Sequence, residues 1–117
     1  TGDRIRVSVP ELRVGTAAAT AIALVVHELA TNAVKYGSLS VPSGTLDVSC
    51  TSDDGMVTIV WTERGGPPVS ALRNPGGFGT TLISQCVTRQ LGGSIVTDWP
   101  SEGVVVTLRM NKARLEA

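Results

Sequence analysis

The longest apolar segment of the chain, residues 16–36, constrains the fold most strongly. Its first half consists of Ala, Ile, Leu and Val with almost no polar interruption, which predicts a helix capped by Thr16, running to Tyr36 and closed by Gly37. Because the apolar surface nearly encircles this first half, the helix should be buried on most sides. Such a helix packs naturally against a sheet, so we expect a sheet beneath it.

Strand-like segments surround this helix. Residues 4–10 alternate Ile5, Val7 and Val9 with polar residues, which predicts a strand with one buried face. Residues 46–52 and 56–63 predict an antiparallel hairpin, because the Asp54-Gly55 pair between them favours a tight turn. Residues 94–99 and 104–110 predict a closing strand pair. Residues 80–91 predict a second helix, and the Pro- and Gly-rich residues 64–79 an irregular loop. This order indicates an α/β (α+β) two-layer sandwich, with a mixed, mostly antiparallel sheet of about five strands and helices on one face.

Length and composition narrow the classes of function. The 117 residues fit a single domain, 1–117, and ten basic against ten acidic residues give no reason to expect a nucleic-acid partner. Only Cys50 and Cys86 are present, at a spacing that suits neither zinc nor a redox pair, so both are expected to be reduced, buried thiols. Residues 17–26 are too short to cross a bilayer and no signal pattern opens the chain, which favours a cytoplasmic location. The chain opens without a Met, so we expect it to be a piece of a longer protein.

Four polar side chains interrupt the second half of the predicted helix. Glu28 and Asn32 stand four apart and Asn32 and Lys35 three apart, so a carboxylate, an amide and an ammonium share one surface. An amide oxygen with phosphate oxygens suits Mg²⁺, and Lys35 would neutralise a phosphate. The alternative is a solvated Glu28–Asn32 pair with Lys35 extending into solvent at the helix end. His27 diverges from Glu28 and is either a structural histidine or a residue near the phosphates that orients Glu28.

Two further groups carry chemistry. Gly77 and Gly79 precede the second predicted helix, where backbone N–H groups and the helix dipole favour phosphate; the alternative is a glycine turn without a ligand. No Gly-Lys-Ser/Thr follows, which excludes a Walker loop. Glu63 shares the core-facing side of its strand with Trp61, and a buried carboxylate there would accept from an adenine amino group. The alternative for Glu63 is a salt bridge with Arg64 or Arg73, and Trp61 is predicted to be a core residue.

Together these segments resemble the ATP-binding catalytic domain of bacterial sensor histidine kinases, specifically the HWE family within the GHKL ATPase superfamily. Three segments in the family's order carry the resemblance: HELATNAVKYGSLS resembles its N box, WTERGGPPV its first glycine box and GGFGTTLI its second. His27, Trp61 and Glu63 supply the letters that define the family. The resemblance covers nearly the whole chain.

The resemblance implies a Bergerat-type ATP-binding fold that holds ATP and Mg²⁺ between the predicted long helix and the loop before Thr80. Asn32 would bind the metal, Glu28 would position or activate the phosphoryl acceptor, and Glu63 would replace the aspartate that usually receives adenine. Lys35, as the second catalytic residue, would lie near the phosphates. The remaining nucleotide-binding positions would be His27 and Tyr36 near the phosphates, Gly65 and Gly66 at the base, and Gly77, Phe78, Gly79, Thr80 and Thr81 beside the triphosphate.

Two departures from the superfamily pattern concern the nucleotide. Many members carry a threonine that contacts the adenine-binding acid where this chain has Val104, so the base contact is expected to differ in detail. The predicted lid, residues 67–76, is also short, so ATP is expected to be held weakly after isolation.

The activity implied is transfer of the γ-phosphoryl group of Mg-ATP to a histidine on a separate dimerisation domain, from which a response regulator takes it. The parent protein would be a homodimer whose kinase domain touches neither membrane nor nucleic acid, and the isolated domain is not expected to phosphorylate itself. The alternatives are a nucleotide-binding interaction module without kinase activity and an anti-sigma-type serine kinase. The second shares the fold but lacks the Trp61–Glu63 pattern.

Overall fold

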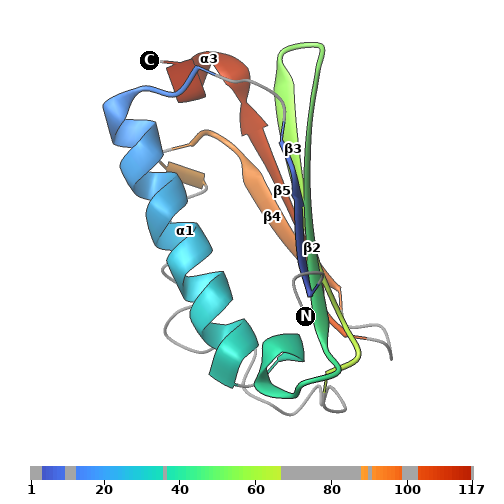
Figure 1. Cartoon of the computed structure of the whole chain (residues 1–117). Helices are drawn as coiled ribbons and strands as arrows, with labels where there is room; N and C mark the ends of the chain where they lie inside the picture. The colour runs from blue at the N-terminus through green and yellow to red at the C-terminus, as the bar shows by residue number, and fades with distance from the viewer. Residues whose placement is uncertain are drawn as a thin grey trace.

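A long helix, α1 (Thr16–Lys35), lies across one face of a twisted sheet (Figure 1). The computed structural model describes residues 4–9, 13–35, 37–66, 88–89, 91–98 and 103–116. The predicted two-layer arrangement, with a helix on one face of a mixed sheet, is therefore confirmed. Tyr36, Cys86 and most of the predicted loop and second helix, residues 67–87, lie outside the described residues.

The sheet has five strands in the order β1-β2-β3-β5-β4. Strand β1 runs parallel to β2, and the other three pairs are antiparallel, so the mixed and mostly antiparallel sheet is also confirmed. The strands are β1 (Ile5–Ser8), β2 (Thr45–Asp53), β3 (Met56–Arg64), β4 (Ser94–Asp98) and β5 (Val105–Asn111).

The hairpin between β2 and β3 has the geometry that its sequence predicts. Asp54 and Gly55 form the turn with φ values of 49° and 77°, both in the left-handed region that a two-residue hairpin turn requires. The register continues from Asp53 opposite Met56 to Thr45 opposite Arg64. This register sets Trp61 opposite Val48 on one side and opposite Val106 on the other, at the centre of the sheet.

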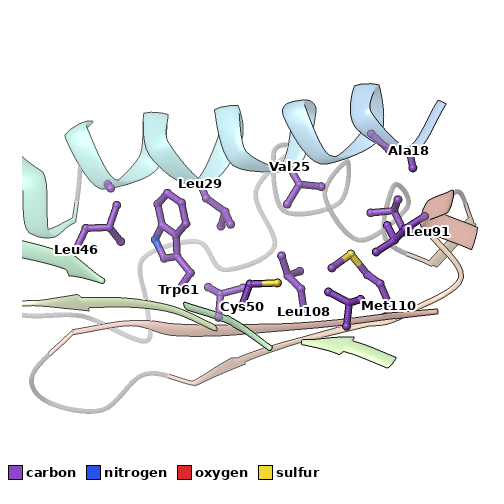
Figure 2. Packing of buried hydrophobic residues seen from close by; sticks show 14 residues of the cluster. Ala18, Val25, Leu29, Leu46, Cys50, Trp61, Leu91, Leu108 and Met110 are labelled. Carbon is purple, nitrogen blue, oxygen red and sulfur yellow. The ribbon is translucent and has the colours of Figure 1, made fainter. Parts of the chain in front are cut away.

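The core lies between α1 and the sheet (Figure 2). Alanines make up much of the buried face of α1, so the helix approaches the strands closely, and larger side chains from β2, β3 and β5 fill the space below. Cys50 and Trp61 belong to this core, as predicted. The buried helix residues are Ala18, Ala21, Val25, Leu29 and Ala33, and the sheet residues are Leu46, Cys50, Val57, Trp61, Val106, Leu108 and Met110.

The whole of α1 is apolar enough, and long enough, to meet the length and composition of a membrane span. Only the shorter apolar segment at residues 17–26 was considered from the sequence, so we did not predict that the whole helix reaches the length of a membrane span. Its buried residues follow a helical period on the side that faces the sheet, and the polar residues His27, Glu28 and Asn32 occupy its second half. In this structure α1 is therefore the core helix of the sandwich. Its burial on most sides was predicted wrongly: only the face toward the sheet is buried, and Leu24, Val26 and Val34 on other faces are exposed.

Strand β1 differs from its prediction, because neither of its faces is buried. Ile5, Val7 and Val9 were expected to face the core, but they are 51%, 62% and 56% exposed. The physical reason is position: β1 is an edge strand, and the buried strand side chains beneath α1 come from β2, β3 and β5. Alternation in a sequence indicates the two faces of a strand but not whether anything covers them.

A short helix after the last strand, α3 (Lys112–Glu116), was not predicted. Asn111 begins it, since its Oδ1 accepts a hydrogen bond from Ala113 N at 2.8 Å. Leu115 is buried, and its carbonyl accepts from Gly15 N at 2.6 Å. Helix α3 therefore connects the amino end of α1 to β5, the last strand of the chain.

Candidate functional site

Two of the residues singled out in the sequence, Asn32 and Glu63, belong to elements that meet at one end of the sandwich. The carboxyl end of α1, the short 3-10 helix η1 (Ser38–Ser40), the start of β2 and the end of β3 meet there, opposite the end that α3 occupies (Figure 1). Glu63 comes from β3 and Asn32 from the last turns of α1. Two segments that the sequence separates by about a quarter of the chain thus meet at one site.

Glu63 is a buried carboxylate with defined partners. It is 5% exposed, and its two oxygens accept one hydrogen bond each: Oε2 from the Trp61 indole Nε1 at 2.8 Å and Oε1 from the Ser38 backbone N at 3.0 Å. Its exposed neighbour Arg64 is not a partner of this carboxylate, and Arg73 lies outside the described residues. The alternative of a salt bridge with Arg64 is therefore wrong.

Glycines allow the backbone to come close to this carboxylate. A Cβ at Gly37 would fall on Glu63 Oε1, and one at Gly103 would fall on the Glu63 backbone carbonyl. A Cβ at Gly66 would lie 2.7 Å from Ser38 Cα. Such distances require glycine, so the surroundings of Glu63 are built from glycines that no larger residue can replace without movement.

The glycines after β3 have contacts of their own. Gly65 has φ +73° and a backbone carbonyl that accepts from Ser43 Oγ at 3.4 Å, and a Cβ there would meet Ser43 O at 3.0 Å. Gly65 and Gly66 thus pack on the segment after α1. In the described residues both therefore serve close backbone packing; whether they also border a base remains a prediction.

The helical residues Glu28, Asn32 and Lys35 all lie in the second half of α1. Glu28 and Asn32 are half-buried and Lys35 is exposed at the last residue of α1. The Asn32 carbonyl accepts from Gly37 N at 3.0 Å, so Asn32 lies one turn from the glycine that abuts Glu63. Asn32 and the glycine that abuts Glu63 therefore belong to the same end of α1.

His27 is exposed, which differs from the expectation of a satisfied structural histidine. Its backbone carbonyl accepts from Thr31 Oγ1 at 2.7 Å, but among the described residues no hydrogen bond to its ring is found. No contact with Glu28 supports the role of orienting that carboxylate. His27 is therefore an exposed side chain on α1 whose ring has no hydrogen-bond partner in the part of the chain that the structure describes.

Ser38 is the residue that sequence reasoning missed. It is 2% exposed, and its Oγ is the one buried side-chain oxygen or nitrogen of the described residues without a hydrogen-bond partner. Its backbone N holds Glu63, as described above. The pattern Gly-Ser after a helix gave no signal of this, because the contact depends on the meeting of η1 with β3.

The backbone around Val104 shows how the site differs from the superfamily pattern. Val104 offers its carbonyl to Glu63 N at 2.9 Å, so this position contacts the acid through the main chain. A valine has no hydroxyl for the carboxylate, and the donors to that carboxylate here are Trp61 and Ser38. The difference expected in the contact with the base stays a prediction.

The residues of this end fit a nucleotide with a bound cation. A carboxylate has about four lone-pair sites, and Glu63 uses two, so it can accept from a ligand amino group. In the described part of the chain no group of three or more His, Cys, Asp or Glu could hold a metal by itself. A cation beside Asn32 would thus need ligand oxygens as well, which suits Mg²⁺ and phosphate. The remaining predicted phosphate residues, Tyr36 and 77–81, lie outside the described residues.

Comparisons with known proteins found a matching family model and similar proteins. Residues 5–110 match the family model of the histidine kinase-like ATPase domain. The blue-light-activated histidine kinase 1 of Erythrobacter litoralis is 44% identical over 104 residues, which span 87% of this chain and 29% of that protein. The chain thus spans under a third of the length of this relative.

Solved structures show the same fold. The histidine kinase domain of an Erythrobacter litoralis blue-light activated histidine kinase superposes with a TM-score of 0.81 at 20% identity, over 99% of this chain and 55% of that one. Histidine kinase ThkA, solved in complex with the response regulator protein TrrA, gives a TM-score of 0.71 at 19% identity, over 97% of this chain and 35% of that one.

Proposed function

The chain belongs to the histidine kinase-like ATPase domain family, and from this premise we propose that it binds Mg-ATP and supplies the γ-phosphoryl group to a histidine outside these residues. The observation that carries the proposal is Glu63: a buried carboxylate with unused lone pairs, packed against the end of the helix that bears Asn32. A buried acid of this kind is costly unless a ligand or the fold uses it.

Each residue has one role in this proposal. Glu63 accepts from the exocyclic amino group of adenine, and Asn32 offers its amide oxygen to Mg²⁺. Lys35, at the exposed end of α1, neutralises phosphate charge, and Glu28 positions the acceptor histidine for attack. Bound Mg²⁺ would neutralise charge on the phosphate oxygens. Catalysis then rests on positioning and electrostatics, as is general for phosphoryl transfer.

The acceptor and its partners belong to the parent protein. Since the chain spans 29% of its Erythrobacter relative, the dimerisation domain with the acceptor histidine is proposed to lie on another segment. The response regulator seen with ThkA supports the same class of partner for the parent. A homodimeric parent and a cytoplasmic kinase domain complete the proposal.

The test is titration of ATP into the domain with and without Mg²⁺, followed by calorimetry. Asn32→Ala is expected to lose the magnesium-dependent part of the affinity, roughly 10- to 100-fold for a contact with a charged group. Thr31→Ala is the matched control, because among the described residues its hydroxyl bonds to the His27 carbonyl one turn earlier on α1 and to nothing else.

Three outcomes separate the candidates. A magnesium-dependent affinity that Asn32→Ala removes supports the nucleotide site. Equal magnesium dependence in the wild type and Asn32→Ala would refute the assignment of Asn32. No binding of ATP to the wild type under either condition would refute the kinase proposal and favour an interaction module.

A further inference from the structure

The hydrogen bond between Trp61 and Glu63 carries an inference beyond the binding of ATP. Trp61 precedes Glu63 by two residues on β3, so both side chains point to the helix side of the sheet. The indole lies between α1 and the sheet, close to Leu46 and Leu29 (Figure 2). Its one polar atom, Nε1, donates to Glu63 Oε2 at 2.8 Å.

The indole is held more firmly than the carboxylate that it contacts. Trp61 is 3% exposed and packed in the core, and a core side chain occupies a defined rotamer. A glutamate has three side-chain torsions, and each freely rotating torsion lowers the fraction of time in a binding geometry. The N–H of Trp61 and the N–H of Ser38 bond to different oxygens, so together they fix both the position and the plane of the carboxylate.

The two donors also leave the carboxylate able to bind. Each oxygen accepts one hydrogen bond from the protein and retains a lone pair for another donor. Preorganised acceptors of this kind gain affinity because less freedom is lost when the ligand binds. The ring of Trp61 therefore packs in the core, while its N–H has a second task, which is to hold the carboxylate.

We propose that Trp61 is a positioning residue for base recognition: its indole N–H fixes the Glu63 carboxylate so that an amino group on the purine ring can be recognised. The proposal rests on the proposed function, in which Glu63 accepts from adenine. It assigns a physical reason to the presence of tryptophan and glutamate two residues apart on one strand. Trp61 itself touches neither the base nor the phosphates in this proposal.

The test compares two nucleotides that differ only at the amino group, ATP and purine riboside triphosphate, which has hydrogen at that position. The wild type is expected to prefer ATP by about tenfold or more, the ratio typical of a hydrogen bond to a charged group. Trp61→Phe keeps an aromatic ring in the core but removes the N–H, and its preference is expected to fall to about threefold or less. The ratio is insensitive to a general loss of binding, because both nucleotides share the sugar and phosphates.

Ile59→Val is the matched control. Ile59 lies two residues before Trp61 on the same side of β3 and is packed against the core, but it has no polar group. Its variant is expected to keep the full preference for ATP. A similar fall in preference for Ile59→Val and Trp61→Phe would show a packing effect and overturn the proposal.

A measurement on the wild type keeps the test independent of the folding of Trp61→Phe. The indole N–H resonance of Trp61, distinguished from that of Trp99 with Trp99→Phe, is expected to shift when ATP binds and to shift much less with purine riboside triphosphate. The reason is that the amino group donates to the same carboxylate as the indole, which changes the charge on the oxygen that the indole N–H contacts. An equal shift with both nucleotides, or none with saturating ATP, would overturn the proposal.

The outcomes also separate this inference from the proposed function. A wild type that binds neither nucleotide refutes the proposed function itself. A wild type that binds both equally refutes the role of Glu63 and, with it, that of Trp61. A wild type that prefers ATP, with the preference retained in Trp61→Phe, refutes Trp61 alone.

Discussion

The Ser38 hydroxyl is a buried polar group without a hydrogen bond, next to the backbone N–H that holds Glu63. An unsatisfied buried hydroxyl costs about 1–3 kcal/mol. Ser38→Ala is therefore expected to raise the free energy of unfolding of the ligand-free domain by about 1 kcal/mol, measured by urea denaturation. Ser52→Ala, on an exposed position of β2, should leave it unchanged within about 0.5 kcal/mol. A loss of stability in Ser38→Ala would mean that the hydroxyl has a partner.

Cys50 gives a pH dependence whose sign follows from its burial. Burial raises the pKa of the Cys50 thiol, because desolvation disfavours the thiolate. Above about pH 8.5, the ordinary thiol pKa, the unfolded chain releases this proton while the folded chain keeps it, so stability falls as pH rises. Below that pH both states are protonated and the contribution is complete. Between about pH 7 and pH 10 the wild type should lose more stability in urea than Cys50→Ala does. Equal losses in both proteins would contradict this.

For single residues, the sequence predicted which face of a strand a side chain occupies, because this follows from the two-residue alternation of a strand. Glu63 and Trp61 were placed on the core side of one strand because side chains alternate, and both are buried there. The partners of Glu63 were not predicted, because one of them is a backbone N–H that reaches the acid only after η1 meets β3. The exposure of His27 was also missed, since it depends on what covers that side of α1.

Among the elements, the turn of the β2–β3 hairpin allows the cost of a left-handed backbone to be measured apart from any steric clash. Gly55 has φ +77° and no atom within 4 Å of the place where a Cβ would stand. Gly55→Ala is therefore expected to lose about 1 kcal/mol in urea denaturation, from the left-handed conformation alone. Gly103→Ala should lose clearly more, because its Cβ would meet the Glu63 carbonyl. Equal losses would mean that the backbone at Gly103 shifts away from the Glu63 carbonyl at no cost.

Periodicity and turn residues were enough to predict the elements but not their neighbours. Helix α1 and the hairpin follow from an apolar segment and an Asp-Gly pair, both local signals. The exposed faces of β1 and the presence of α3 were missed, because each depends on which other elements lie beside it in the fold. The Asn111 cap was a readable signal for α3, although a helix as short as Lys112–Glu116 carries little period of its own.

For the molecule as a whole, both ends of α1 are held to the rest of the fold by backbone contacts and hydrogen bonds. Its amino end meets α3 through the Gly15–Leu115 hydrogen bond, and its carboxyl end meets β3 through Gly37, Ser38 and Glu63. The proposed metal ligand Asn32 lies at the second of these ends. Nucleotide binding should thus stabilise the whole sandwich, because it links the layers where they already meet.

This link predicts a thermal shift. A ligand present at about a hundred times its Kd stabilises the folded state by about 2.7 kcal/mol, so Mg-ATP should raise the melting temperature of the wild type by roughly 10 °C. Calorimetric scans of Asn32→Ala with Mg-ATP should show a much smaller rise at the same concentration. Thr31→Ala should behave as the wild type does. A rise that is equal in all three proteins would place the nucleotide away from Asn32.

Autophosphorylation tests whether the phosphoryl acceptor lies in this domain or in another part of the parent protein. His27 is the only histidine of the chain, so a tag-free domain can form phosphohistidine at no other position. His27 is exposed on the same helix as Asn32 and Lys35, so its position relative to them is set by α1 and it is not expected to align with the γ-phosphate for attack. With γ-labelled ATP and Mg²⁺ the isolated domain should therefore acquire no acid-labile phosphate, whereas a separately supplied dimerisation domain from a relative should be labelled in its presence. Glu28→Gln, which keeps the size of the side chain, should reduce that second labelling while ATP binding persists. Label on the isolated wild type that disappears in His27→Gln would contradict the assignment of the acceptor to another domain.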